Sequence, residues 1–172
     1  MLKIVLLGYM GSGKSTIAQL LSKSVSIDSL DLDQIIEKKE EKSIKDIFKE
    51  RGEIYFRKIE SQVFNNLMGS EEEMILSIGG GTPCYANNHE LLKKDGVVSI
   101  YLKASVEELY ARLLLEKENR PLIATKDAEE LKEYIAKHLF DRSYYYNQAK
   151  HKISVDGKSP DEIVAEIIKV LA

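Results

Sequence analysis

The sequence has 172 residues, a net charge of −3 and 44% hydrophobic residues, which predicts one globular domain without room for a separate substrate domain. This charge balance argues against a nucleic-acid-binding protein. The single cysteine, Cys84, excludes an intrachain disulfide framework and a cysteine-based zinc cluster. Since we also find no signal peptide and no apolar stretch of membrane-spanning length, we expect a cytoplasmic protein.

A glycine-rich loop follows the first predicted strand. Residues 2–7 are almost entirely apolar, as in a strand buried on both faces of a parallel sheet, and residues 17–21 show helical periodicity. Between them, GYMGSGKS at 8–15 matches the phosphate-binding pattern G-x-x-x-x-G-K-[ST]. A glycine turn that matched by chance would lack this strand and helix, so the segment predicts nucleotide binding. In such loops the lysine, here Lys14, reaches the β- and γ-phosphates, and the hydroxyl, here of Ser15, contacts Mg²⁺.

Two carboxylates follow the predicted second strand, residues 25–30. Ligands bind at the carboxyl ends of strands in open α/β sheets, and alternate positions of an extended chain share a face. We therefore expect Asp31 and Asp33 to face the phosphate loop. One would lie near Mg²⁺ and one would accept a hydrogen bond from a substrate hydroxyl. The alternative is that Asp33 only caps a helix beginning at Gln34.

A long helical region is predicted over 43–67, with a break at Gly52. Within it, Arg57 has Glu53 four residues before it and Glu60 three after it. These could form a surface ion-pair ladder of small energetic value. They could instead hold the guanidinium in place to bind an anionic substrate group through two hydrogen bonds.

Three consecutive glycines follow the next predicted strand, residues 74–78. Gly79, Gly80 and Gly81 would allow a tight turn or the close approach of a ligand to the backbone, and their place after a parallel strand favours the ligand. Cys84 is interpreted as a small buried side chain rather than a reactive thiol. The three histidines have no metal-like spacing.

The second half of the chain continues the alternation of strands and helices. We predict strands at 97–102 and 152–155, and a helix over 127–149. Capping boxes are predicted where Ser105 and Ser159 precede helices. The charged segment 116–121 carries Arg120 and ends at a proline, which is typical either of a lid over phosphates or of an ordinary connector.

In their order and spacing these motifs resemble the shikimate kinase family over almost the whole chain. The segments that carry the resemblance are the phosphate loop, Asp31-x-Asp33, Gly52-Glu53 with Phe56-Arg57 and Glu60, Gly79 to Gly81, Asn119-Arg120-Pro121-Leu122, and Arg142 with Tyr146.

The resemblance implies an α/β three-layer sandwich in which helices flank a five-stranded parallel sheet, a P-loop kinase fold of the nucleoside-monophosphate-kinase type with a lid. Residues 1–172 would be one domain, with a substrate-binding insertion at about 33–61 and the lid at about 112–125. It implies transfer of the ATP γ-phosphoryl group to the 3-hydroxyl of shikimate, towards chorismate and the aromatic amino acids. It further implies one Mg²⁺ per subunit, ATP as co-substrate, a monomer, and no nucleic-acid or membrane partner.

The family's site residues map onto this sequence one by one. Asp33 would grip the ring hydroxyls and accept the proton of the attacking one, and Lys14 and Arg120 would act with it in catalysis. The remaining positions are as follows: Gly11, Ser12, Gly13, Lys14, Ser15, Thr16, Arg112 and Arg120 for the nucleotide, with Arg112 beside the adenine; Arg57, Gly79, Gly80, Gly81 and Arg142 for shikimate, with the two arginines on its carboxylate; Ser15 and Asp31 for the metal.

Two other functions compete with this one. Another small-metabolite kinase of the same fold, such as a gluconate kinase or a nucleotide kinase, would share the phosphate loop, and only the block around Arg57 discriminates against it. A GTP-dependent switch is disfavoured, because the sequence has no Asn-Lys-x-Asp motif and no Asp-x-x-Gly element after a switch strand.

Overall fold

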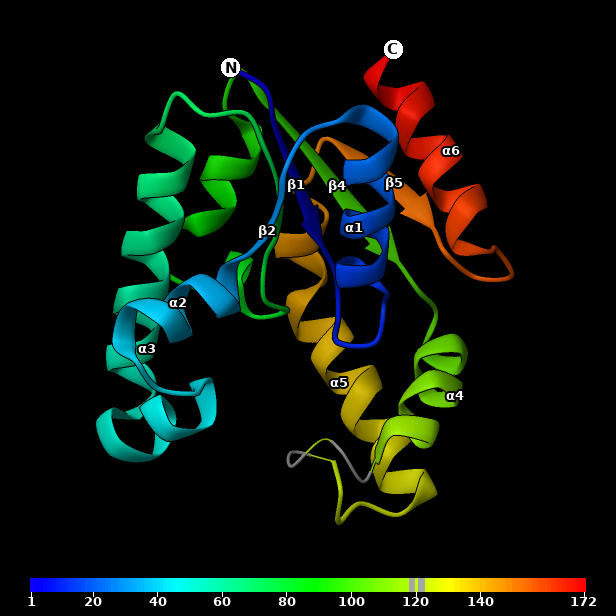
Figure 1. Ribbon diagram of the computed structural model, residues 1–172. Helices are drawn as coiled ribbons and strands as arrows, with labels where there is room; N and C mark the ends of the chain where they lie inside the picture. Colours follow the sequence, from blue (N-terminus) through cyan, green and yellow to red (C-terminus); the bar gives the residue numbers. More distant parts are fainter. Residues whose placement is uncertain (118–119, 121–122) are drawn as a thin grey trace.

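β1 (Lys3–Leu7) lies in the middle of a parallel sheet, and all five of its residues are buried. The structure is a computed structural model that describes residues 1–117, 120 and 123–172, and Figure 1 shows its layers of helices around the sheet. The sheet order is β2-β3-β1-β4-β5, and every neighbouring pair is parallel. The other strands are β2 (Ser29–Asp31), β3 (Met74–Ser77), β4 (Val97–Lys103) and β5 (His151–Ser154). The five-stranded parallel sheet that we predicted is confirmed.

Helices cover both faces of the sheet. α1 (Lys14–Val25) and α6 (Pro160–Leu171) pack side by side on one face. On the other face, Ser99 of β4 donates a hydrogen bond to a carbonyl of η2 (Asn88–Lys93), and Tyr101, two residues on, packs on Tyr146 at the end of α5 (Ala128–Tyr146). Residues two apart in a strand point to the same face, so η2 and α5 share this side.

Two helix pairs flank the carboxyl ends of the strands. α2 (Leu32–Glu40) packs on α3 (Ile44–Gly69), and α4 (Val106–Glu116) packs on α5. Inside α3, Gly52 has φ 85° and ψ 171°, a left-handed conformation that glycine tolerates; the predicted break is therefore confirmed. In Figure 1 α2 and α3 lie to the left of the sheet, and α4 with the start of α5 lies at the lower right.

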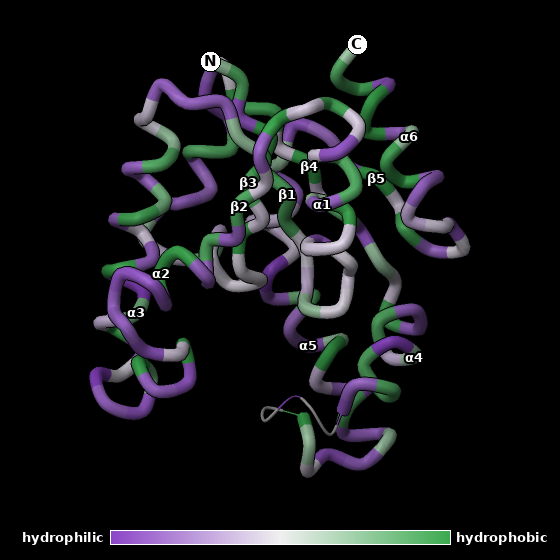
Figure 2. The backbone as a smooth tube through the Cα atoms, in the orientation of Figure 1, coloured by the Kyte–Doolittle hydropathy of each residue, from purple (hydrophilic) through white to green (hydrophobic). Residues whose placement is uncertain are grey.

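The hydrophobic core lies between the sheet and its helices. Figure 2 shows apolar residues concentrated along the strands and on the inward faces of α1 and α6. Cys84 is half-buried rather than fully buried, in the short helix η1 (Thr82–Cys84), and burial raises the pKa of its thiol to about 11. Of the helices that the structure describes, none combines the length and the apolarity needed to cross a membrane.

The predicted second strand was wrong in its first half. α1 continues to Val25, and Ser26 ends it in a left-handed conformation, so that the strand begins only at Ser29. The prediction of extended chain through Asp33 was also wrong, because α2 begins at Leu32. Its N-cap is Asp31, whose carboxylate accepts a hydrogen bond from the Gln34 amide at 3.2 Å. Asp33 lies in the first turn of the helix and is not its cap.

Within the described residues, both predicted capping boxes are only half formed. The Ser159 hydroxyl accepts a hydrogen bond from the Glu162 amide, but no return bond from the Glu162 carboxylate is found. The Ser105 hydroxyl accepts a hydrogen bond from the Glu108 amide as expected. The Glu108 carboxylate does not return to Ser105, because it accepts from Arg112 Nε at 2.8 Å. The backbone N–H of Ser105 donates instead to Asp156. The structure therefore uses Glu108 to position an arginine rather than to close the cap.

Candidate active site

The glycine-rich loop leaves the start of α1 open. Gly13 is the N-cap residue, with φ 96° and no side-chain capping bond. The first N–H groups of a helix have no carbonyl partner within the helix, and the helix dipole makes this end positive. A cap without a side chain thus exposes these groups to a phosphate.

Lys14 is held at the mouth of this loop. Its Nζ donates to the Gly8 carbonyl at 2.7 Å and to the Tyr9 carbonyl at 3.1 Å. Burial lowers the pKa of Lys14 to about 8, and Asp33 and Asp31 oppose this shift. Because the ammonium bonds only to neutral carbonyls among the residues that the structure describes, its charge is available to an incoming phosphate.

Ser15 and Asp31 bring two oxygen atoms together beside the loop. The Ser15 hydroxyl donates to the Asp31 carboxylate at 3.5 Å. Mg²⁺ in kinases is held by one or two protein oxygens, with phosphates and water completing its shell. The donor set at this point therefore fits a magnesium ion next to bound nucleotide.

Asp33 faces the glycine turn from the first turn of α2. A Cβ atom at Gly79 would lie 3.5 Å from Asp33 Oδ1. Burial, together with the nearby carboxylates of Asp31 and Glu60, raises the pKa of Asp33 to about 6, while Lys14 acts in the opposite direction. A carboxylate with a pKa close to neutrality is suited to accept a proton.

Arg57 is fixed by a buried carboxylate. Its Nη1 donates to Glu60 Oε1 at 2.9 Å, and the Glu60 side chain is only 1% exposed. The other oxygen of Glu60 accepts from the Thr82 hydroxyl at 2.8 Å, whereas Glu53 lies 3.7 Å from Arg57 Nε and is half exposed. A surface ladder would not bury one of its carboxylates, so the structure favours a positioned arginine.

The glycine turn brings the second arginine next to the first. A Cβ atom at Gly80 would lie 3.1 Å from Arg142 Nη1, and one at Gly81 would lie 2.7 Å from Arg57 Nη2. Tyr146 is fully buried and donates to the Gly80 carbonyl at 2.6 Å, and Arg142 donates to its hydroxyl at 3.5 Å. The two guanidinium groups therefore lie against adjacent glycines.

This close approach predicts the effect of a single methyl group. Gly81 has φ −93° and ψ −12°, which alanine adopts without strain, so Gly81→Ala would act only by pushing the Arg57 guanidinium away. We expect the KM for the carboxylate-bearing substrate that the sequence implies to rise about ten- to a hundredfold, with the KM for the nucleotide unchanged. Steady-state kinetics in each substrate would measure this. Gly69→Ala, where a Cβ atom meets nothing within 4 Å, is the matched control, and equal behaviour of the two variants would contradict the prediction.

Two further arginines border the phosphate loop from α4 and the segment after it. Arg112 Nη1 donates to the Gly11 carbonyl at 3.1 Å, and Glu108 holds its Nε. Arg120 donates from Nε and Nη2 to the Glu116 carboxylate. Its predicted neighbours Asn119, Pro121 and Leu122 lie outside the described residues.

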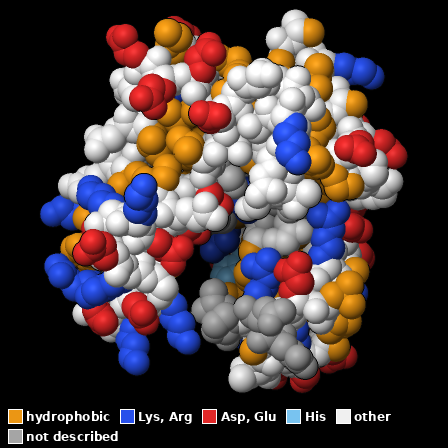
Figure 3. Space-filling model, viewed as in Figure 1, with side chains coloured by type: hydrophobic (Ala, Val, Ile, Leu, Met, Phe, Trp, Pro, Cys, Tyr) orange, Lys and Arg blue, Asp and Glu red, His pale blue; other side chains and the backbone are white. Residues whose placement is uncertain are grey.

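A cleft of about 530 Å³ unites most of the predicted residues. Figure 3 shows the molecule hollowed between the side of α2 and α3 and the side of α4 and α5. The predicted residues that line it are Gly11, Gly13, Lys14, Ser15, Thr16, Asp31, Asp33, Gly79, Gly80, Arg112 and Arg120. Ser12 is buried in the loop beneath it. Arg57, Gly81 and Arg142 do not line this cleft but adjoin it through the glycine turn.

Sequence reasoning gave no role to three tyrosines that hold this arrangement together. The Tyr9 hydroxyl shares a hydrogen bond of 2.9 Å with His138 of α5, Tyr146 ties Gly80 to Arg142, and the Tyr85 ring lies 4.0 Å from the Arg57 guanidinium carbon. Only Tyr146 had a signal in the sequence, its place in the segment after Arg142. For Tyr9 and Tyr85 a tyrosine in a loop carries no pattern of its own.

Comparison with known proteins identifies the family of the chain and agrees with its fold. Residues 10–172 match the family model described as shikimate kinase. The chain is 61% identical to a shikimate kinase of Flavobacterium johnsoniae over 99% of both chains. A crystal structure of shikimate kinase from Bacteroides thetaiotaomicron has a TM-score of 0.91 at 29% identity, covering 99% of this chain and 98% of the other.

A shikimate kinase from Acinetobacter baumannii, solved in complex with shikimate, has a TM-score of 0.86 at 30% identity and covers 99% of this chain and 93% of the other. The match of a family model to almost the whole chain and the high identity to a full-length relative decide between the kinases of this fold. The chain belongs to the shikimate kinase family, and its reaction transfers the γ-phosphoryl group of ATP to the 3-hydroxyl of shikimate in aromatic amino acid biosynthesis.

Proposed function

We propose that this reaction takes place in the cleft, with ATP on the phosphate loop and shikimate against the glycine turn. The observation that carries the proposal is the position of the turn: Gly79 adjoins Asp33, and Gly80 and Gly81 adjoin Arg142 and Arg57. A ligand over this turn would meet a carboxylate at one end and two guanidinium groups at the other. Shikimate has hydroxyls and a carboxylate to match them.

In the proposed chemistry, the 3-hydroxyl oxygen attacks the γ-phosphorus of ATP. The new O–P bond forms as the bond to the β,γ-bridging oxygen breaks, ADP leaves, and the proton of the hydroxyl passes to Asp33. Lys14 and Arg120 place positive charge around the transferring group, where phosphoryl transfer needs it most. Arg112 contacts the nucleotide beside the loop, and Gly11, Ser12, Gly13 and Thr16 complete its phosphate site.

We also propose that Ser15 and Asp31 hold one magnesium ion. Two protein oxygens 3.5 Å apart at the phosphate loop support this. When bound, the ion would offset negative charge on the β- and γ-phosphates. Asp31→Asn keeps an oxygen that can cap α2, so the fold should stay intact. It is expected to raise the Mg²⁺ concentration needed for half-maximal activity.

For the molecule as a whole we propose one domain of 172 residues, with α2 and the first part of α3, about 33–61, as the substrate-binding insertion. Residues of about 112–125 would form the lid; within them, 118–119 and 121–122 lie outside the described part of the chain. We propose a cytoplasmic monomer without nucleic-acid or membrane partners, as suits an enzyme that uses ATP on small metabolites. Light scattering after size-exclusion chromatography would test the oligomeric state.

The direct test is ADP release from ATP and Mg²⁺, with and without acceptor. Shikimate should stimulate release strongly, whereas gluconate, quinate and nucleoside monophosphates should not, and GTP should replace ATP poorly. The product should carry its phosphate on the 3-hydroxyl, which phosphorus NMR identifies. Preferential stimulation by another acceptor would refute the assignment of shikimate to this cleft.

The raised pKa of Asp33 gives the reaction a defined pH dependence. The base must be ionised, and its pKa of about 6 means that the active form is lost as the pH falls through 6. We expect kcat/KM to fall about tenfold per pH unit below that value, and Asp33→Asn to lower kcat about a hundredfold or more and to abolish the acidic limb. Asp46→Asn, in the first turn of α3, is the control. An unchanged acidic limb in Asp33→Asn would assign it to another group.

A further inference from the structure

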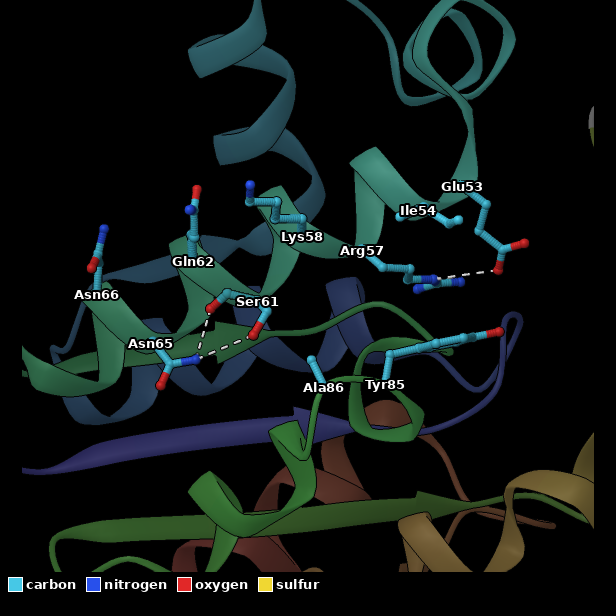
Figure 4. Close-up of a pocket in the computed structure, with 10 residues that line it drawn as sticks. All are labelled: Glu53, Ile54, Arg57, Lys58, Ser61, Gln62, Asn65, Asn66, Tyr85 and Ala86. Carbon is cyan, nitrogen blue, oxygen red and sulfur yellow. Dashed lines mark hydrogen bonds and ion pairs between the residues drawn. The ribbon is translucent and has the colours of Figure 1, made fainter.

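Tyr85 lies directly after η1, at the edge of a groove formed by α3. Figure 4 shows its ring alongside the Arg57 side chain, with Glu53 beyond the guanidinium. The ring centroid is 4.0 Å from Arg57 Cζ, well within the range of a cation–π contact. Phe56, the residue before Arg57, is farther away at 5.2 Å. Tyr85 is thus the aromatic side chain closest to the charge of Arg57 among the described residues.

Few of the N–H groups of Arg57 are engaged. Within the described residues, its one hydrogen bond goes from Nη1 to Glu60, and Nε is buried without a hydrogen-bond partner. No hydrogen bond of Nη2 is found within the described residues, and a Cβ atom at Gly81 would lie 2.7 Å from it. A guanidinium has five N–H donors in one plane, and here the second N–H of Nη1 and both N–H groups of Nη2 remain for a ligand.

A stacked ring can fix the plane of a guanidinium without using any of these donors. Glu53, the second carboxylate beside Arg57, lies 3.7 Å from Nε and is half exposed, so it holds the guanidinium only loosely. A closer carboxylate would take up N–H groups and offset the charge that an anionic ligand needs. An aromatic face contacts the flat side of the fork and leaves its edge free. This is the arrangement that binding a carboxylate through two parallel hydrogen bonds requires.

We propose that Tyr85 is a positioning residue for shikimate: its ring holds the Arg57 guanidinium in the plane that receives the substrate carboxylate. The proposal rests on the role of Arg57 in shikimate binding proposed above. Tyr85 does not touch the reacting atoms, so its effect is confined to the binding of one substrate.

The backbone that carries Tyr85 is anchored to the same carboxylate as Arg57. Glu60 accepts from Arg57 through one oxygen and from the Thr82 hydroxyl through the other. The Cys84 amide donates to the Gly81 carbonyl at 3.0 Å, and the Asn88 amide donates to the Tyr85 carbonyl at 2.9 Å. Ring and guanidinium are therefore fixed relative to each other. No hydrogen bond of the Tyr85 hydroxyl is found within the described residues, so the ring face carries the effect.

The test compares Tyr85→Phe, which keeps the ring, with Tyr85→Leu, which keeps bulk but removes the aromatic face. Tyr85 is 39% exposed, so both variants should fold, and thermal melting would check this. We expect Tyr85→Leu to raise the KM for shikimate about three- to tenfold, with kcat and the KM for ATP unchanged, and Tyr85→Phe to match the unmodified enzyme. Tyr144→Leu is the matched control, since Tyr144 is also exposed and its ring neighbours are His89 and Tyr145.

Unchanged kinetics in Tyr85→Leu, equal losses in the leucine and phenylalanine variants, or a parallel rise in both KM values would each overturn the proposal. Arg57→Ala separates it from the proposed function. If Arg57→Ala abolishes shikimate binding while Tyr85→Leu has no effect, only the positioning role fails. If Arg57→Ala leaves shikimate binding intact, the proposed role of Arg57 fails, and that of Tyr85 fails with it.

Discussion

Replacing Arg57 by alanine is expected to raise the KM for shikimate by at least about a hundredfold while leaving nucleotide binding nearly intact. Two charge-assisted hydrogen bonds to a carboxylate are worth about 3–6 kcal/mol together, and the lower value already corresponds to more than a hundredfold in affinity. The Arg57 side chain is 17% exposed, so water would replace those bonds poorly. Calorimetric titration with shikimate and, separately, with ADP would measure both effects.

Two variants control for the loss of the ion pair. Within the described part of the chain, removing Arg57 leaves the buried Glu60 with only the Thr82 hydroxyl as a hydrogen-bond partner, so some loss of stability is expected. Arg57→Lys keeps the charge beside Glu60 but not the planar fork, and it should still bind shikimate about tenfold or more weakly. Arg51→Ala removes an arginine of the same helix that stacks on Tyr55. Equal loss of shikimate and nucleotide binding in Arg57→Ala would mean that Arg57 is structural.

Replacing Lys14 by methionine is expected to lower kcat by about a thousandfold or more, the largest effect on the chemical step that we predict. Methionine has nearly the same length but no charge to place on the transferring phosphoryl group. The Gly8 and Tyr9 carbonyls hold the Lys14 ammonium at the phosphate loop. Methionine cannot form these hydrogen bonds, so the variant has no charge at this position. Single-turnover measurement of phosphoryl transfer would report the step, and direct titration should show shikimate binding unchanged.

The control for this variant is Lys23→Met, in the last turn of the same helix. The lowered pKa of Lys14 adds a pH dependence: its charged form is lost as the pH rises through about 8 in the free protein. In the unmodified enzyme kcat/KM for ATP should therefore decline above that pH. A kcat for Lys14→Met within tenfold of the unmodified value would remove Lys14 from the catalytic step.

The sequence by itself determined the sheet and the phosphate loop, because both depend on local patterns. Unbroken apolar runs form the buried strands, and the glycines, Lys14 and Ser15 occupy positions fixed by a turn of defined length. The boundary of the second strand was wrong because Val25 and Ile27 are β-branched apolar residues, which fit the end of a buried helix as well as a strand. The place of Asp31 and Asp33 at a strand end was confirmed, although Asp33 is helical.

The tertiary structure alone decided which contacts the individual side chains of the site make, and therefore which role each can have. Whether Arg57 belonged to a surface ladder or to a pocket depended on the burial of Glu60, which follows from Thr82 packing against it from another part of the chain. Tyr85 reaches Arg57 from a loop that no periodicity encodes. Tyr146 lies one helical turn after Arg142 in α5, but only the packing of α5 brings its hydroxyl to the Gly80 carbonyl. Contacts between residues distant in sequence depend on how the elements pack, and only the folded chain brings their atoms within bonding distance.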